Sequence, residues 1–336
     1  MRPTISTIAA VAAGLFASAV SAQSQVAIYW GQGAYQRELS VVCQDPSVDI
    51  VNIAFVNGFP KDSNKYPDLN FGNACGGFTF PNPDGTPSNF LGSCDTITRG
   101  IKTCKQNGKK VLLSLGGGYP TDYYLADQLA AQWLAKVLVE AFGPKMESST
   151  MPRPFGDDVA VDGFDLDIES STAVGDQKFQ FYGDLVKYIK QRSPGMLISS
   201  APQCVVPDAH LDKAIEEAPF DYVFVQFYNT DACSAMRGFT DLRAGTDTGF
   251  TWNTWTEKLQ KRSANPNVKL FLGLSAGTNG ANPNHYLPPT AANYLIKDLK
   301  NKPLFGGVML WEATVSQNNT MFDQPYSQWI KYSLDG

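Results

Sequence analysis

The sequence is poor in charged residues and nearly lacks histidine. Charged residues make up 18% of the 336 positions, and 27 lysines and arginines against 32 acids leave a formal net charge of -5. These proportions exclude a nucleic-acid binder that works through a basic excess, and 43% apolar content excludes a disordered polymer. His210 and His285 stand alone, and the six cysteines match no zinc spacing. We therefore expect no metal, no cofactor and no nucleic-acid partner.

Long apolar runs are also scarce, and the run near the start of the chain is short. Residues 8–20 follow a single charge at Arg2 and end in small residues, which is typical of a secretory signal. A membrane span needs roughly 18 to 20 apolar residues, so an uncleaved anchor is the weaker alternative. We expect a signal peptide at 1–22 and a secreted, monomeric protein at 23–336 that has no membrane partner.

Short β-rich apolar runs alternate with segments of helical period along the rest of the chain. Near-continuous runs such as Val111-Leu112-Leu113 suit strands that are buried on both faces of a parallel sheet. Eight such units predict a single α/β domain, a (β/α)8 TIM barrel. The expected strands are 26–30, 50–57, 110–115, 161–168, 197–201, 222–228, 269–273 and 307–311, and the expected helices are 95–107, 125–142, 178–191, 208–218, 252–263 and 291–300.

The longest insertion, 58–92, follows the second expected strand and is rich in Pro, Asn and Gly. It should lie on the C-terminal face of the barrel, where barrels of this kind keep their functional sites. A doubly wound open sheet is the alternative fold, and it needs a glycine-rich phosphate turn after the first strand. The segment 31–36 has two glycines but ends in Gln36, so a nucleotide site is disfavoured.

Three acids share one face of the strand expected at 161–168. Side chains alternate along a strand, so Asp165, Asp167 and Glu169 point one way and the apolar residues between them point the other. Neighbouring acids would lie about 7 Å apart and repel by roughly 2 kcal/mol at an effective dielectric near 20. At least one acid should therefore keep its proton at neutral pH, as a general acid must.

A solvated acidic edge and a divalent metal site are the alternatives for this strand. A solvated edge does not explain the apolar residues between the acids. A metal site would recruit further His, Asp or Glu from other strand ends, whereas 114–118 and 226–229 offer neutral hydrogen-bonding groups. We therefore assign the acids to proton chemistry.

The run from Asp162 to Glu169 resembles the D-x-x-D-x-D-x-E signature of glycoside hydrolase family 18, and Ser-Leu-Gly-Gly at 114–117 resembles its second motif, S-x-G-G. Further segments resemble the plant-type (class III, hevamine-like) chitinases of this family and their fungal relatives: 28–32, 51–55, 201–204, 225–229 and 308–311. The resemblance implies that 23–336 is a (β/α)8 catalytic domain acting on chitin and chitooligosaccharides, outside the cell or in a cell wall.

The resemblance also implies a role for each residue of the site. Glu169 would protonate the glycosidic oxygen, and the substrate's own 2-acetamido oxygen would attack the anomeric carbon in place of a second carboxylate. Asp167 would polarise the acetamido N–H, with Asp165 behind it taking up the shared proton. Tyr228 would donate its hydroxyl to the acetamido oxygen, and Trp311 would form a flat floor under the sugar. The substrate-binding candidates of second rank are Gln226, Asn229, Tyr29, Gln32, Phe55 and Gly117.

Several of these residues also have a purely structural interpretation. Tyr228 and Trp311 could be ordinary barrel packing, and Gly116 and Gly117 could merely relieve crowding at a strand end. Their joint placement at strand ends favours function, because all would meet at one barrel mouth. Asp162 is out of phase with the other acids, so we interpret it as structural.

Six cysteines suit a secreted protein and allow fifteen pairings, which the order of the strands narrows. Cysteines that follow neighbouring strands, or that share the loop region after one strand, are expected to pair, and the resemblance implies the same pattern. The expected pairs are Cys43–Cys104, Cys75–Cys94 and Cys204–Cys233.

Two further expectations concern the backbone and the surface. The resemblance implies non-proline cis peptides at Ala54–Phe55 and Trp311–Glu312. Asn318-Asn319-Thr320 is an N-glycosylation acceptor, a permissive signal only.

An endo-acting chitinase that cuts β-1,4 bonds between N-acetylglucosamine units with retention is the favoured function. A catalytically silent, lectin-like member of the same family is an alternative, although such members typically lose the glutamate or its neighbours and the motif here is intact. An endo-β-N-acetylglucosaminidase shares the mechanism, but the hevamine-like segments speak against it.

Overall fold

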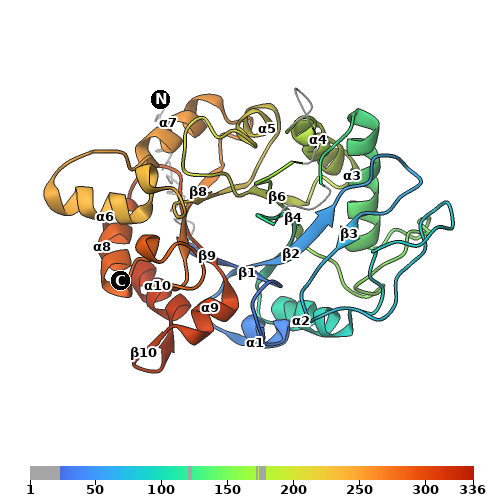
Figure 1. Cartoon of the computed structure of the whole chain (residues 1–336), viewed down its shortest axis with the longest axis horizontal. Coiled ribbons are helices and arrows are strands. Elements are labelled where there is room, and N and C mark those ends of the chain that lie inside the picture. Colours follow the sequence, from blue (N-terminus) through green and yellow to red (C-terminus); the bar gives the residue numbers. More distant parts are fainter. Residues whose placement is uncertain (1–22, 120–122, 172, 174–178) are drawn as a thin grey trace, which may run out of the picture.

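The computed structural model describes residues 23–119, 123–171, 173 and 179–336. Eight parallel strands form a closed barrel that is surrounded by helices (Figure 1). The ring closes because β1 (Gln25–Trp30) pairs with both β2 (Ile50–Gly58) and β9 (Phe305–Trp311). The other barrel strands are β4 (Lys110–Gly116), β5 (Gly163–Asp167), β6 (Leu197–Ser200), β7 (Tyr222–Gln226) and β8 (Lys269–Ser275). The (β/α)8 barrel that the sequence predicts is confirmed.

The expected helices are present, with shorter bounds in several cases. They are α2 (Asp95–Gln106), α3 (Gln128–Phe142), α4 (Tyr182–Arg192), α5 (Asp212–Glu217), α7 (Trp252–Arg262) and α8 (Pro289–Leu299). Helix α3 begins later than expected because the Asp127 side chain caps it, accepting from the N–H of Ala130 at 2.8 Å. Helix α5 begins at Asp212 because the Asp208 carboxyl accepts backbone N–H groups of the preceding turn.

Among the residues that the structure describes, four further α-helices were not predicted, because all lie outside the segments with clear helical period. They are α1 (Leu39–Gln44), α6 (Ala235–Ala244), α9 (Ala313–Asn318) and α10 (Tyr326–Asp335). Two have side-chain caps: Ser234 accepts from the N–H of Arg237, and Glu312 accepts from those of Thr314 and Val315. The expected signal peptide lies outside the described residues. Within the described part of the chain, no helix has the length and apolar character that a membrane crossing requires.

The alternation expected along β5 sorts its side chains into two layers. Phe164, Leu166 and Ile168 are buried in the layer between strands and helices. The barrel interior holds a second apolar cluster, made by Ala27, Tyr29, Ile50, Ala54, Phe55, Leu112, Ala201, Phe224, Tyr228, Phe271 and Met309. Because side chains fill the interior, ligand chemistry is confined to the barrel mouth.

The insertion after β2 folds back over that strand. The short strand β3 (Asp68–Leu69) pairs antiparallel with β2. Phe55 and Asn70 then exchange two backbone hydrogen bonds, of 2.7 and 2.9 Å. This pairing brings residue 70, which is 15 positions along the chain from Phe55, to the mouth of the barrel.

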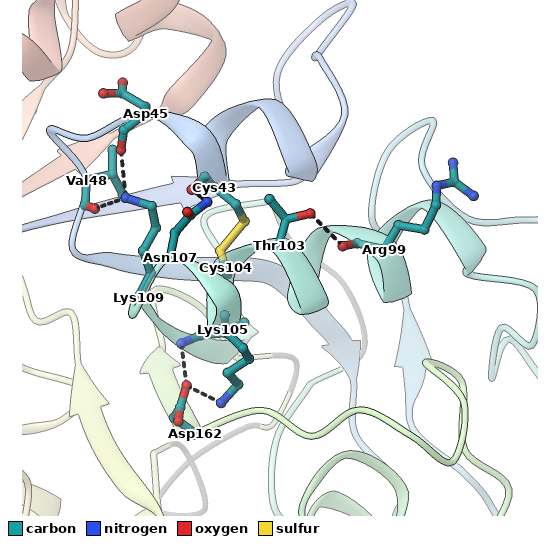
Figure 2. Close-up of a disulfide and its surroundings, with 11 residues drawn as sticks. Cys43, Asp45, Val48, Arg99, Thr103, Cys104, Lys105, Asn107, Lys109 and Asp162 are labelled. Carbon is teal, nitrogen blue, oxygen red and sulfur yellow. Dashed lines mark hydrogen bonds and ion pairs between the residues drawn. A yellow bond between two sulfur atoms is a disulfide. The ribbon is translucent and has the colours of Figure 1, made fainter.

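All three expected disulfides are present: Cys43–Cys104, Cys75–Cys94 and Cys204–Cys233. Figure 2 shows the first, which joins α1 to α2. The same view contains Asp162, whose carboxylate pairs with the Lys105 ammonium at 2.6 Å. Asp162 also accepts from the backbone N–H of Val111 at 2.8 Å, which agrees with a structural role.

The expected cis peptides are also present, at Ala54–Phe55 and Trp311–Glu312. Asn318, the glycosylation candidate, lies at the end of α9.

Candidate active site

The acids of β5 and the residues just after it form a column that begins inside the barrel. Asp165, the lowest, is fully buried. Its carboxyl oxygens accept hydrogen bonds from the hydroxyls of Tyr29 at 2.7 Å, Ser114 at 2.6 Å and Ser199 at 2.6 Å. Burial raises the pKa of Asp165, and the three hydrogen bonds oppose that rise. Asp165 is therefore a fixed group that is shielded from solvent.

Asp167 and Glu169 follow Asp165 on the same face, and each of the two influences the pKa of the other. Asp167 is 2% exposed and accepts from the Gln226 amide at 3.0 Å. Burial, and then the charges of Glu169 and Asp165, raise the pKa of Asp167 well above its ordinary value. Burial also raises the pKa of Glu169, against the hydrogen bonds from Gln226 and Asp167. The pair can thus retain a proton at a pH where exposed carboxyls have lost theirs.

Tyr123 fixes the backbone from which the Glu169 side chain projects. Its hydroxyl accepts the N–H groups of Glu169 at 3.2 Å and Ser170 at 2.8 Å, and donates to the carbonyl of Gly117 at 2.7 Å. Burial raises the pKa of Tyr123, so the hydroxyl keeps the proton that it donates. The phenol therefore ties the end of β4 to the end of β5.

Two glycines at the end of β4 allow the strands to approach closely. Gly116 and Gly117 have φ of +106° and +101°, a region that favours glycine. A Cβ on Gly116 would lie 2.2 Å from the carbonyl oxygen of Asp167, and one on Gly117 would lie 2.8 Å from the Phe55 ring. Relief of crowding, one interpretation of these glycines, is thus correct, and both residues also line the cavity.

A cavity of about 350 Å³ opens above the acids. Two aromatic residues line it: the rings of Phe55 and Trp311 stack with centroids 6.0 Å apart, and the Tyr29 ring packs on Trp311 at a tilt, with centroids 5.4 Å apart. A stacked aromatic pair of this kind suits the apolar face of a ring-shaped ligand. The lining residues are Gln32, Phe55, Asn57, Asn70, Gly116, Gly117, Gly118, Tyr119, Glu169, Gln226, Tyr228, Asn229, Gly280 and Trp311.

Tyr228 presents a protonated hydroxyl to this cavity. It is 4% exposed, and burial followed by the charges of Asp167 and Glu169 raises its pKa well above the ordinary value. The phenol therefore remains a hydrogen-bond donor throughout the pH range in which carboxyls titrate.

The structure brings most of the predicted residues together at the cavity: Glu169, Tyr228, Trp311, Gln226, Asn229, Gln32, Phe55 and Gly117 line it. Asp165, Asp167 and Tyr29 are not among the lining residues: Tyr29 donates to Asp165 and packs on Trp311, and the charges of Glu169 and Asp165 act on Asp167. Sequence reasoning missed the lining residues Asn57, Asn70, Gly118, Tyr119 and Gly280. Asn57 could have been found, because it is the last residue of an expected strand.

A metal site is the alternative that the sequence suggests for these acids. Among the residues that the structure describes, no three His, Cys, Asp or Glu side chains are grouped so that they could hold a metal ion. The Asp165 oxygens are already engaged by three hydroxyls.

A (β/α)8 barrel with buried acids and a stacked aromatic pair at its mouth has the architecture of a glycoside hydrolase. Residues 25–293 match the family model described as glycosyl hydrolases family 18. The chain therefore belongs to glycosyl hydrolase family 18.

The chain is 42% identical over 332 residues to Endochitinase A1 of Aspergillus fumigatus. The match covers 96% of this chain and 39% of that relative, so this chain spans about two fifths of its length.

Two solved structures illustrate the range of proteins built on this fold. The ICChI chitinase of Ipomoea carnea has a TM-score of 0.70 and 30% identity, covering 92% of this chain and 99% of that one. The xylanase and alpha-amylase inhibitor protein XAIP-II of Scadoxus multiflorus has a TM-score of 0.71 and 27% identity, covering 91% and 97%. Because a chitinase and an inhibitor share the fold, the function of this chain must be inferred from its site.

Proposed function

We propose that this protein is a secreted, endo-acting chitinase that hydrolyses β-1,4 bonds between N-acetylglucosamine units with retention, the substrate's 2-acetamido group acting as the nucleophile. The substrates are chitin and its oligosaccharides. The similarity to fungal endochitinases supports the substrate class, and the arrangement of the cavity supports the mechanism.

One observation carries the mechanism. Among the described residues that line the cavity, Glu169 is the sole carboxylate. A retaining glycosidase of the ordinary type needs a second carboxylate about 5 to 5.5 Å from the first as its nucleophile. Asp167, the nearest candidate, is 2% exposed, and one of its oxygens already accepts from the Gln226 amide, so it can receive a hydrogen bond from a bound group but is poorly placed to attack a carbon. A nucleophile carried by the substrate fits this site better.

Glu169 donates its proton to the glycosidic oxygen as the bond from that oxygen to the anomeric carbon breaks. The acetamido oxygen bonds to the anomeric carbon from the opposite face, giving a cyclic oxazolinium ion. Asp167 first passes its own proton to Asp165, whose pKa burial also raises, and the Asp167 carboxylate then accepts a hydrogen bond from the acetamido N–H. Tyr228 donates to the acetamido group and fixes its angle of attack.

Water then opens the oxazolinium ion. The Glu169 carboxylate takes a proton from the attacking water, whose oxygen bonds to the anomeric carbon on the face that the leaving group had occupied. Two inversions at one carbon leave its configuration unchanged. Glu169 is thereby returned to its protonated form, and the proton on Asp165 returns to Asp167 when the acetamido group is released.

The test is to follow the fresh products of N-acetylglucosamine oligomers by proton NMR before mutarotation, alongside chitosan of graded acetylation. We expect the initial product to be the β-anomer and fully deacetylated chitosan to resist cleavage. Initial α-anomer, or rapid cleavage of the deacetylated polymer, would rule out substrate assistance. Activity that disappears on chelation and returns with a divalent ion would revive a metal mechanism.

A silent carbohydrate binder is the second candidate, because XAIP-II shows that proteins described as inhibitors share this fold. Such a protein would bind N-acetylglucosamine oligomers without shortening them. An endo-β-N-acetylglucosaminidase would instead release N-glycans from a glycoprotein. Product analysis with both substrates separates the three functions.

A further inference from the structure

The loops that follow β6, β7 and β8 are joined to one another beside the cavity. A disulfide links Cys204, after β6, to Cys233, in the 3₁₀ helix Asp231–Cys233 after β7. Two polar contacts then link the β7 loop to the β8 loop. These contacts hold a residue of the cavity wall, Asn229, against the β8 loop.

The first polar contact orients the Asn229 side chain. Its Oδ1 accepts the backbone N–H of Asn282 at 2.8 Å, and its backbone has φ of +63°, which asparagine tolerates better than most residues. Because Oδ1 is engaged, the amide NH₂ is the part left to donate. Within the described ranges no residue accepts from that NH₂, and Asn229 is exposed on the wall of the cavity.

The second polar contact joins Asp231 to His285. His285 is 4% exposed, and its Nε2 contacts Oδ1 of Asp231, whose side chain is 88% exposed. The other ring nitrogen, Nδ1, is buried and has no hydrogen-bond partner among the described residues. We therefore assign the ring proton of neutral His285 to Nε2, where Asp231 accepts it.

His285 and the N–H that Asn229 accepts belong to one tight turn. Asn282 caps the 3₁₀ helix Pro283–His285, and its carbonyl accepts the N–H of His285 at 2.9 Å. The Asn282 side chain caps the same turn through the N–H of Asn284, at 3.1 Å. Fixing the His285 ring therefore fixes the direction of the Asn282 N–H.

We propose that Asp231 and His285 are positioning residues: together they hold the β8 turn on the β7 loop, so that the Asn229 amide is presented as a donor to an oxygen of the bound sugar. This inference rests on the proposed function, because the ligand it names is the N-acetylglucosamine chain. Neither Asp231 nor His285 lines the cavity, so both act through Asn229. A donor that contacts ground state and transition state equally changes KM and leaves kcat unchanged.

The kinetic test compares Asp231→Ala with Asp231→Asn, because the amide oxygen of asparagine can still accept from Nε2 of His285. On N-acetylglucosamine oligomers, Asn229→Ala and Asp231→Ala should each raise KM by roughly three- to tenfold, the worth of one net hydrogen bond, with kcat within about twofold. The KM and kcat of Asp231→Asn should stay close to those of wild type. Glu257→Ala removes an exposed acid on α7 and is the matched control.

A double-mutant cycle shows whether Asp231 acts through Asn229. In the Asn229→Ala background, Asp231→Ala should raise KM no further. Three outcomes would each overturn the proposal. They are a full additional increase in KM in the double variant, a KM as high in Asp231→Asn as in Asp231→Ala, and an unchanged KM in Asp231→Ala.

Hydrogen exchange tests the arrangement without any substrate. The amides of Asn282 and His285 should exchange at least about threefold faster in Asp231→Ala than in wild type or Asp231→Asn, at unchanged global stability. Unchanged exchange would overturn the positioning role even in a fully active enzyme. If the wild type neither binds nor cleaves oligomers, the proposed function fails and the named sugar ligand with it. The hydrogen-exchange rates of the Asn282 and His285 amides would then be the only test of whether Asp231 and His285 hold the turn.

Discussion

The phenol of Tyr29 on β1 donates a 2.7 Å hydrogen bond to Asp165 on β5, a residue 136 positions away in the sequence. Burial, followed by the charge of Asp165, raises the pKa of Tyr29 well above its ordinary value, so the phenol remains a donor. Ser114 and Ser199 donate to the same carboxyl from the two strands that flank β5. The three donors oppose the rise in the pKa of Asp165, while Asp167, which has fewer donors, has the more strongly raised pKa.

Glu169→Gln should reduce kcat by about 10² to 10⁴, because the amide cannot protonate the leaving oxygen. Its shape is unchanged, so binding of N-acetylglucosamine oligomers should stay within about threefold of wild type. Steady-state kinetics and titration calorimetry measure the two effects. Glu257→Gln, an exposed control, should alter neither, and substantial turnover by Glu169→Gln would remove Glu169 from the acid role.

Asp162→Ala should lower the stability of the protein and leave kcat almost unchanged. The carboxylate pairs with Lys105 and accepts the Val111 N–H, so its loss should lower the free energy of unfolding by about 1 to 3 kcal/mol. The value of kcat should stay within about twofold, because Asp162 lies outside the cavity. Asp162→Asn keeps the hydrogen bond and should lose less stability. Urea denaturation and oligomer cleavage test this, and a large fall in kcat in the folded variant would contradict it.

Asp167→Asn should change how stability depends on pH. The pKa of Asp167 is higher in the folded protein than in the unfolded chain. The folded state therefore binds the extra proton, and its stabilisation is complete below the unfolded pKa and is lost as pH rises through the folded pKa.

The unfolding free energy of Asp167→Asn should consequently fall less than that of wild type between pH 4 and pH 8. Denaturant titrations at several pH values measure this difference. Asp247→Asn, which changes an exposed acid, should follow the wild-type curve. Parallel curves for wild type and Asp167→Asn would show that the buried acid does not carry the raised pKa.

Gly117→Ala should damage the site, whereas Gly85→Ala should not. Both glycines have positive φ, of +101° and +81°, so an added Cβ strains each backbone by about 1 to 2 kcal/mol. At Gly117 the Cβ also meets the Phe55 ring at 2.8 Å, while at Gly85 no atom lies within 4 Å. Moving Phe55 disturbs the ring stacked on Trp311, so we expect kcat/KM to fall by roughly tenfold or more in Gly117→Ala. Equal activity in the two variants would show that the Phe55 wall is not needed.

Local pattern was enough to predict the barrel and its acid strand. Period-two alternation places Phe164, Leu166 and Ile168 against the helices and turns the acids inward, because successive side chains of a strand point to opposite faces of the sheet. The order of the strands narrowed the possible disulfides, since parallel strands end on one face, and the family resemblance implied the same three pairs, which are present. The spacing of the acids along the strand was likewise enough to predict that they repel one another.

Tertiary structure decided which residues complete the site. Asn70 reaches the cavity through backbone pairing with Phe55, and Tyr123 bridges two strand ends, but neither residue belongs to a periodic segment or a motif. The unpredicted helices α6 and α9 begin at caps whose partners are backbone N–H groups, a signal that is weaker than apolar periodicity. Which acid holds the proton depends on burial and on donors from β1, β4 and β6, which meet only when the barrel closes. The sequence by itself determined the type of chemistry, through the spacing of the acids. Closure of the barrel decided the geometry of the site, because hydrogen bonds and desolvation depend on distances between residues that are far apart in the chain.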